Sequence, residues 1–220
     1  MLIVAITDIH GSGRISKKLD NDLAAADAVI VAGDLTTFGT RRDAERVLSP
    51  ILKRASRVLA VPGNCDPGAV SDYLTEKDVN LHGDVRVLGG ITFLGLGGSL
   101  PCPGSTPNEY TEEELAALLR RASRNLADST PLVVVSHQPP RDTCNDCIGR
   151  DEHVGSRAVR TFLERTIPRV CVTGHIHEGM GIDHIGPTCI VNPGPLRQGG
   201  YARIDIEADG DSTVEIRKAE

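Results

Sequence analysis

The sequence has few aromatic residues. Its 220 residues include three Phe, three Tyr and no Trp. Proteins that bind single-stranded nucleic acid stack bases on aromatic side chains, so this scarcity argues against that class of protein. The formal net charge of −6 at pH 7 provides no general attraction to nucleic acid or to an anionic membrane surface. We therefore expect neither nucleic acid nor a membrane as a partner.

Long hydrophobic runs are also missing. No apolar stretch approaches the roughly 18–20 residues of a membrane-spanning helix. The first residues lack the basic start of a secretory signal and reach an acidic residue, Asp8, after one short apolar run. The six Cys are then expected to be reduced thiols. With 40% hydrophobic and 25% charged residues, the composition predicts a soluble, cytoplasmic protein with a single domain over residues 1–220.

Short apolar runs alternate with helical stretches along the chain. This alternation is typical of strand–helix–strand units and predicts an α/β fold with largely parallel sheets. Residues 85–88 and 91–96 flank Gly89-Gly90 and predict a hairpin. The other strands are expected at 2–6, 29–32, 58–61, 132–135, 170–172, 180–185, 188–191, 201–206 and 213–217. Helices are expected at 16–25, 40–55, 111–127 and 156–165. Two mixed sheets flanked by helices are the simplest assembly of these elements.

Several predicted strands end in residues that can bind a metal ion. In parallel α/β sheets, ligands bind beyond the carboxyl ends of the strands, so these side chains are expected to lie close together. Four of the seven His belong to the set. Its members are Asp8, His10, Asp34, Asn64, His137, His175 and His177.

This mixture of imidazole and oxygen ligands fits first-row transition metals. Asp34 is alone on its turn and is the natural carboxylate to bridge two ions. Two ions about 3.5–4 Å apart would bind a phosphoryl group and activate a water between them, so the predicted nucleophile is a metal-bridging hydroxide. We expect two divalent ions, manganese first, with iron, zinc, nickel or cobalt as alternatives.

The ordered motifs resemble those of the calcineurin-like metallophosphoesterase superfamily. They are Asp8-x-His10, Gly33-Asp34, Gly63-Asn64-Cys65-Asp66, His137 and Gly174-His175-x-His177. The resemblance implies a four-layer α/β/β/α sandwich with two mixed sheets. It also implies one ion held by Asp8, His10, Asp34 and His177, and a second held by Asp34, Asn64, His137 and His175. The small size and the Cys in the Asn motif resemble the compact bacterial and archaeal phosphodiesterase branch, which includes a subunit of retromer.

Cys65 departs from the superfamily pattern, which has His at this position to protonate the leaving oxygen. A thiol is a poor substitute for an imidazolium, and losing a general acid costs about 10²–10⁴ in rate, least where the leaving group is already stable. The sequence therefore predicts hydrolysis of phosphodiesters with acidic leaving groups rather than alkyl monoesters. Without a His to orient, Asp66 is expected to cap the following turn or helix. His153, in the irregular stretch 138–154, could supply a replacement acid, although a solvated loop position is the favoured interpretation.

The candidate catalytic residues are thus Asn64, Cys65, Asp66 and His153. The leading hypothesis is a metal-dependent phosphodiesterase for a small substrate. The alternative is a catalytically weak scaffold or partner-binding protein with the same fold, and a homo-oligomer stays open. Cys144 and Cys147 form a C-x-x-C pair for which a structural position is favoured over a redox or metal-binding role.

Overall fold

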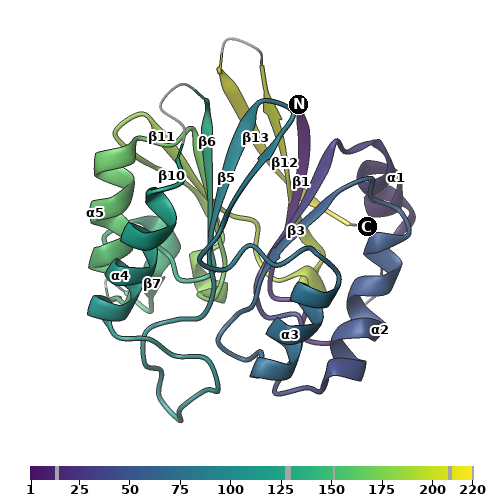
Figure 1. Cartoon of the computed structure of the whole chain (residues 1–220), viewed down its shortest axis with the longest axis horizontal. Helices are drawn as coiled ribbons and strands as arrows, with labels where there is room; N and C mark the ends of the chain where they lie inside the picture. Colours follow the sequence, from purple (N-terminus) through teal and green to yellow (C-terminus); the bar gives the residue numbers. More distant parts are fainter. Residues whose placement is uncertain (13–14, 127–129, 151, 208–209, 220) are drawn as a thin grey trace.

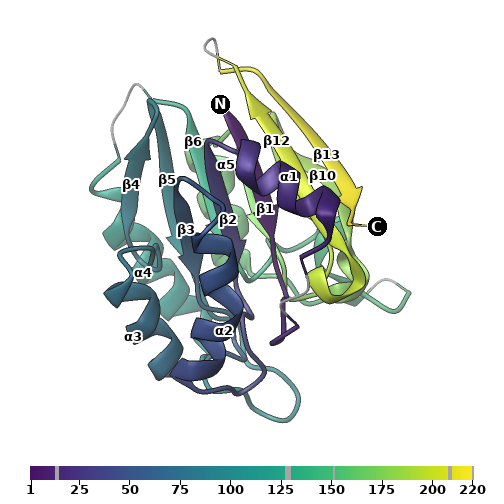
Figure 2. The same cartoon turned by 90° about the vertical axis from the view of Figure 1, so that its right-hand side faces the viewer.

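The computed structural model describes residues 1–12, 15–126, 130–150, 152–207 and 210–219. Two mixed β-sheets pack face to face, with helices on both outer faces (Figure 1). The helices are α1 (Lys17–Ala25), α2 (Arg41–Leu52), α3 (Gly68–Glu76), α4 (Glu112–Ser123) and α5 (Arg157–Thr166). Figure 2 shows α1, α2 and α3 in front of the first sheet, and in Figure 1 α4 and α5 cover the second. The expected four-layer α/β/β/α sandwich is confirmed.

The first sheet has the order β13-β12-β1-β2-β3. Its strands are β1 (Leu2–Ile6), β2 (Ala28–Ala32), β3 (Val58–Val61), β12 (Gly200–Ile206) and β13 (Ser212–Lys218). β1, β2 and β3 are parallel, and β12 and β13 form an antiparallel hairpin that extends the sheet beside β1. β1 is buried on both faces. Val4 and Ile6 pack toward the helices, and Ile3 and Ala5 pack toward the other sheet.

The second sheet has the order β10-β11-β9-β6-β5-β4. Its strands are β4 (Val85–Leu88), β5 (Ile91–Leu96), β6 (Leu132–Ser136), β9 (Val170–Thr173), β10 (Gly181–Ile185) and β11 (Thr188–Asn192). The four central strands are parallel, and β4 and β10 run antiparallel at the edges. Gly89 and Gly90 have φ values of 56° and 81°, as a two-residue hairpin turn requires. The predicted hairpin is confirmed.

Two helices begin directly after Thr residues that cap them. Thr40 and Thr111 each form a capping box with the acidic residue three positions later. The helix expected at 111–127 ends at Ser123, and residue 127 lies outside the described part of the chain. The sequence missed α3, which is short, begins at a Gly and has no side-chain cap. It also missed the small hairpin of β7 (Cys147–Ile148) and β8 (Glu152–His153).

The packing of the sheets positions the site. Apolar residues of both sheets, including Ile30, Val61, Phe93 and Val135, form one buried cluster between them. This packing brings the carboxyl ends of the parallel strands of both sheets to the same edge, the lower one in Figure 1. The polar residues that follow these strands therefore meet there. Among the described residues, no helix is both long and apolar enough to cross a membrane.

Candidate metal centre

Carboxylates and imidazoles from both sheets converge at this edge. His177 Nε2 lies 3.4 Å from Asp8 Oδ1, and His10 Nε2 lies 3.7 Å from Asp34 Oδ2. From the second sheet, His137 Nε2 comes within 3.5 Å of Asp34 Oδ1. Ligand atoms of two sets, Asp8–His10–His177 and Asp8–Asp34–His137, lie within 4.8 Å of one another. Asp8 belongs to both sets, and Asp34 contacts imidazoles from both sheets, so these two carboxylates connect the candidate ligands of the two sheets.

The backbone at these strand ends is strained. Asp8, His10 and Asp34 have φ values of 52°, 50° and 50°, a region that residues other than Gly rarely adopt. Hydrogen bonds between the two turns hold this conformation: the His10 amide donates to the Asp34 carbonyl at 2.9 Å, and the Asp8 amide donates to the Gly33 carbonyl at 3.1 Å. Strained residues of this kind cluster at functional sites, where the surrounding structure maintains them.

Gly63 allows the closest approach of two of these turns. A Cβ at Gly63 would lie 2.0 Å from Asp34 Oδ1, which no packing adjustment could accommodate. The next residues then reach the same carboxylate, because the Cys65 amide donates to Asp34 Oδ1 at 2.8 Å. The Gly-Asn-Cys-Asp turn is thus packed directly against the residue expected to bridge the ions.

Hydrogen bonds fix the orientation of His137. Its Nδ1 lies 2.8 Å from the Ala32 carbonyl, which can only accept, so Nδ1 carries the proton and Nε2 presents a lone pair. Nε2 faces Asn64 Oδ1 at 3.0 Å. In this tautomer two acceptor atoms face one another, and an ion between them would be bound by both, so the arrangement fits a divalent metal ion.

On the other side of the cluster, His10 Nε2 and His177 Nε2 lie 3.3 Å apart. His10 Nδ1 contacts the Thr37 hydroxyl at 3.0 Å. When Nδ1 donates this hydrogen bond, Nε2 carries a lone pair that can bind an ion. The sequence did not single out Arg197, whose guanidinium lies 3.3 Å from His177 Nδ1. Arg197 follows a Pro-Gly-Pro turn, and only the packing of that turn against β1 brings it to the site: the Leu196 amide donates to the Thr7 carbonyl.

Burial and mutual contact shift the pKa values of these groups. Burial raises the pKa of Asp34. Burial would also raise the pKa of Asp8, but the hydrogen bond from His177 and the nearby His137 bring it below its usual value. Burial lowers the pKa of His175 to about 3, so this imidazole is neutral at physiological pH, as a metal ligand must be.

His175 lies at the margin of the cluster. Its ring centroid is 5.3 Å from that of His137, and its amide donates to Asp8 Oδ2 at 3.2 Å. Its Nε2 points to Cys102 Sγ at 3.6 Å. Of its two ring nitrogens, Nδ1 is therefore the one available to an ion. Cys102 is a second neighbour of the site that the sequence did not single out.

The side chains of Cys65 and Asp66, which are neighbours in the sequence, have different surroundings. The Cys65 sulfur lies among the candidate ligands, within 4.8 Å of ligand atoms of His10 and Asp34. Asp66 is fully buried and accepts hydrogen bonds from the amides of Gly63, Leu35 and Thr36.

The prediction that Asp66 caps the following turn or helix is wrong. The cap position of α3 is Pro67 and has no side-chain hydrogen bond. The carboxylate of Asp66 instead points back to the preceding loops, because these present a larger number of unpaired donors: three backbone N–H groups and the Thr36 hydroxyl.

His153 is held away from the ligands. Its Nδ1 lies 2.7 Å from Asp146 Oδ1, and Asp146 is itself fully buried and accepts from the amides of Thr143 and Gly155. Among the described residues, the structure records no contact between His153 and the seven candidate ligands. The described residues 138–150 and 152–154 thus surround a buried carboxylate, and the contacts recorded for His153 do not support a role as proton donor.

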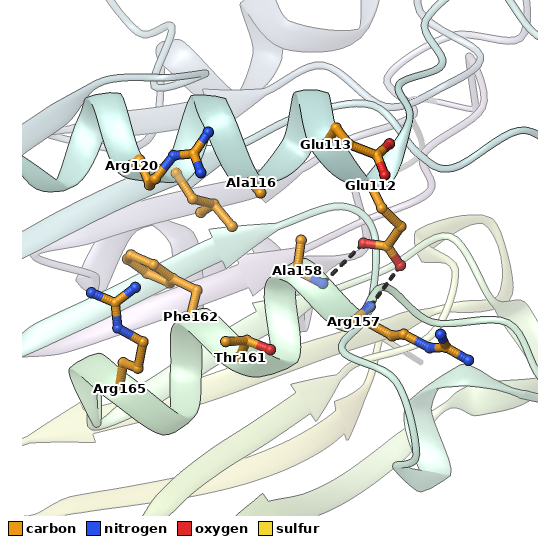
Figure 3. Close-up of a pocket in the computed structure, with 10 residues that line it drawn as sticks. Glu112, Glu113, Ala116, Arg120, Arg157, Ala158, Thr161, Phe162 and Arg165 are labelled. Carbon is orange, nitrogen blue, oxygen red and sulfur yellow. Dashed lines mark hydrogen bonds between the residues drawn. The ribbon is translucent and has the colours of Figure 1, made fainter.

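A separate groove of about 540 Å³ lies between α4 and α5 (Figure 3). Glu112 of α4 accepts hydrogen bonds from the amides of Arg157 and Ala158 and so caps the first turn of α5. None of the groove-lining residues is a candidate ligand. The seven candidate ligands at the strand ends therefore lie outside this groove.

Comparison with known proteins agrees with this geometry. A family model described as calcineurin-like phosphoesterase matches residues 1–179. Protein MJ1162 of Methanocaldococcus jannaschii is 41% identical over 199 residues, which are 89% of this chain and 88% of that protein.

Solved structures show the same fold at low identity. TT1561 of Thermus thermophilus superposes with a TM-score of 0.75 at 18% identity and covers 100% of this chain and 99% of that one. A dimetal phosphatase from Danio rerio superposes with a TM-score of 0.65 at 12% identity, covering 100% and 96%. The family match and the ligand clusters together indicate a metal-dependent phosphoesterase. The chain belongs to the calcineurin-like phosphoesterase family.

Proposed function

We propose that this chain is a phosphodiesterase that works with two divalent metal ions, manganese foremost. The observation that carries the proposal is the convergence of carboxylate, imidazole and amide lone pairs on one small volume, most clearly the facing pair of His137 Nε2 and Asn64 Oδ1. In this proposal the domain extends over residues 1–220.

Each ion is assigned four ligands. Asp8, His10, Asp34 and His177 would hold the first, and Asp34, Asn64, His137 and His175 the second. The fold that the chain shares with a protein described as a dimetal phosphatase supports two ions. Two such ions would lower the pKa of a shared water and stabilise the charge that develops on the phosphoryl oxygens.

The residues of the chain orient this chemistry. The Cys65 amide and the surrounding turn fix one oxygen of Asp34. The Ala32 carbonyl holds the His137 tautomer, and Thr37 contacts the outer nitrogen of His10. Partners of this kind, which contact ligands rather than ions, set ligand orientation and basicity in metal sites.

The preference for diesters rests on the missing proton donor. Besides the four His ligands, the chain has His82, His153 and His184. His82 Nδ1 accepts from the Gly97 amide, His153 pairs with Asp146, and His184 lies on the edge strand β10. Within the part of the chain that the structure describes, none of the three contacts the ligand cluster, so no imidazole is offered to a leaving oxygen. Substrates whose leaving group is stable as an anion, such as aryl diesters, depend least on such a donor.

The test is a comparison of two substrates after metal analysis. Purified protein is stripped with chelator, reloaded with Mn, Fe, Zn, Ni or Co, and assayed on bis-p-nitrophenyl phosphate and p-nitrophenyl phosphate. We expect two ions per chain and a kcat/KM at least tenfold higher for the diester. Dominant monoesterase activity would contradict the diester preference, and lack of binding and activity with every ion would refute the enzyme.

The second candidate is a scaffold that keeps the fold and has little activity. Cys65, where the family pattern has a catalytic His, is the observation that favours it. Metal binding without hydrolysis of any tested phosphodiester would support this alternative. Whether a small phosphodiester, a protein partner or a second copy of the chain binds the site edge is then decided by binding assays and by size-exclusion chromatography.

A further inference from the structure

The side chain of Asn64 could face the site in two ways. In the structure its Oδ1 faces His137 Nε2 at 3.0 Å. A flipped amide would point Nδ2 at the same atom instead. His137 Nε2 carries a lone pair, because Nδ1 donates to the Ala32 carbonyl, so the flipped amide would form a good hydrogen bond. That bond would occupy both groups and exclude a metal ion.

Thr106 decides between the two orientations. Its hydroxyl lies 3.2 Å from Asn64 Nδ2 and 2.7 Å from Glu109 Oε1. A carboxylate can only accept, so the single hydroxyl hydrogen of Thr106 goes to Glu109. The Thr106 oxygen can then only accept from Asn64. This favours the orientation in which Nδ2 faces Thr106 and Oδ1 faces the site.

The other hydrogen of the amide also has a partner. Asn64 Nδ2 lies 3.6 Å from Cys65 Sγ, a weak acceptor. Both N–H groups of Asn64 therefore face acceptors other than His137. Oδ1 is left for an ion.

Glu109 holds Thr106 in place. The same Oε1 atom accepts from the Thr106 amide at 2.7 Å and from the Cys102 amide at 3.2 Å. The hydrogen bond from Thr106 lowers the pKa of Glu109, so the carboxylate is ionised at neutral pH. One carboxylate thus orders the loop that contacts Asn64 through Thr106 and His175 through Cys102.

The loop is also tied to the turn that bears Asn64. The Asn108 amide donates to the Asn64 carbonyl at 3.2 Å, and Asn108 Nδ2 donates to the Gly63 carbonyl at 2.9 Å. Thr106 is therefore held next to Asn64 by contacts independent of its own hydroxyl. A change at that hydroxyl alters its two hydrogen bonds, with Asn64 and Glu109, and leaves the backbone contacts of the loop in place.

We propose that Thr106 and Glu109 are positioning residues that lock the Asn64 amide in its metal-binding orientation. The inference rests on the proposed two-ion site, because Asn64 is assigned to the second ion only. It predicts that loss of the lock weakens the second ion and spares the first.

The experiment is calorimetric titration of metal-free protein with Mn²⁺. For Thr106→Val, which can neither accept from Asn64 nor donate to Glu109, we expect one of the two ions to bind about 10–100-fold more weakly, the range typical of partners that orient ligands. The other ion should keep its affinity within threefold. Thr106→Ser retains the hydroxyl and should restore both affinities to within threefold of the wild type.

Glu109→Ala provides an independent variant, because it frees the Thr106 hydroxyl to donate to a flipped Asn64. It should weaken the same ion as Thr106→Val. Glu113→Ala is its matched control, since Glu113 is an exposed glutamate of α4 and should leave both affinities unchanged.

Wild-type affinity for both ions in Thr106→Val and Glu109→Ala, or an equal loss of both ions, would overturn the inference. Failure of Thr106→Ser to restore the second ion would also overturn it. Failure of the proposed function can be told apart from failure of this inference. Wild-type protein that binds two ions but hydrolyses no phosphoester refutes the proposed enzyme alone. Wild-type protein that binds no ion refutes both the enzyme and the inference.

Discussion

Asp66 holds together the two turns that carry Asp34 and Asn64, and its replacement by Asn should destabilise the protein. Asp66 Oδ1 accepts from the Thr36 amide at 2.8 Å and from the Thr36 hydroxyl at 2.9 Å. Oδ2 accepts from the amides of Leu35 and Gly63 at 3.0 and 2.8 Å. An Asn side chain has one acceptor oxygen, so one of these two pairs loses its acceptor.

The new Asn amide can take two orientations, and the expected loss of stability is that of the less costly one. If the new NH₂ group replaces Oδ1, the Thr36 hydroxyl can rotate and accept from it, and only the Thr36 amide is left buried without a partner. That costs about 1–3 kcal/mol. Burial and the neighbouring Asp34 raise the pKa of Asp66 to about 6; the fold therefore disfavours the ionised form, and loss of the charge does not add to this cost. We expect Asp66→Asn to reduce the free energy of unfolding by about 1–3 kcal/mol.

The assay is urea unfolding of chelator-treated protein, with stability taken from the midpoint and slope. Asp66→Ala should cost more than Asp66→Asn, because it leaves three backbone N–H groups without an acceptor. Asp72→Asn is the matched control: Asp72 is exposed on α3 and should stay within about 0.5 kcal/mol of the wild type. An Asp66→Asn protein as stable as the Asp72→Asn control would refute the reasoning.

Three further predictions concern the site and its surroundings. Cys65→His should raise kcat on p-nitrophenyl phosphate by about tenfold or more, since general acids contribute 10²–10⁴-fold; an unchanged ratio of monoesterase to diesterase activity would count against the leaving-group argument. Asp34→Asn should weaken Mn²⁺ binding by more than about 100-fold at both ions in calorimetry, and retention of either ion would show that Asp34 does not bridge. The hydrogen bond to Asp146 raises the pKa of His153 in the folded protein above 6.5. The stability that this pair contributes is therefore fully present below pH 6.5 and is lost as the pH rises through the pKa of His153 in the folded protein. The difference in Tm between wild type and His153→Gln should therefore be larger at pH 6 than at pH 9, and an equal difference at both would contradict this pairing.

Most strands could be predicted from the sequence because their apolar runs are short, β-branched and bounded by Gly or polar residues. β1 matches its predicted bounds, and the hairpin of β4 and β5 follows from Gly89-Gly90. The elements that were missed have no such local signal. α3 begins with Gly68 and ends without a Gly, and β7 and β8 have two residues each and are ordered around the buried Asp146.

The sequence by itself determined the α/β layering, the family and the seven candidate ligands, since strand periodicity and the spacing of metal-binding residues are local properties of the chain. Only the tertiary structure decided what lies around those ligands. Arg197, Cys102 and Thr106 come to the site from loops with no motif, and Asp66 turns back to earlier loops instead of capping α3. The physical reason is that buried donors and acceptors find partners across the fold, and hydrogen-bond direction depends on distances that no local pattern encodes.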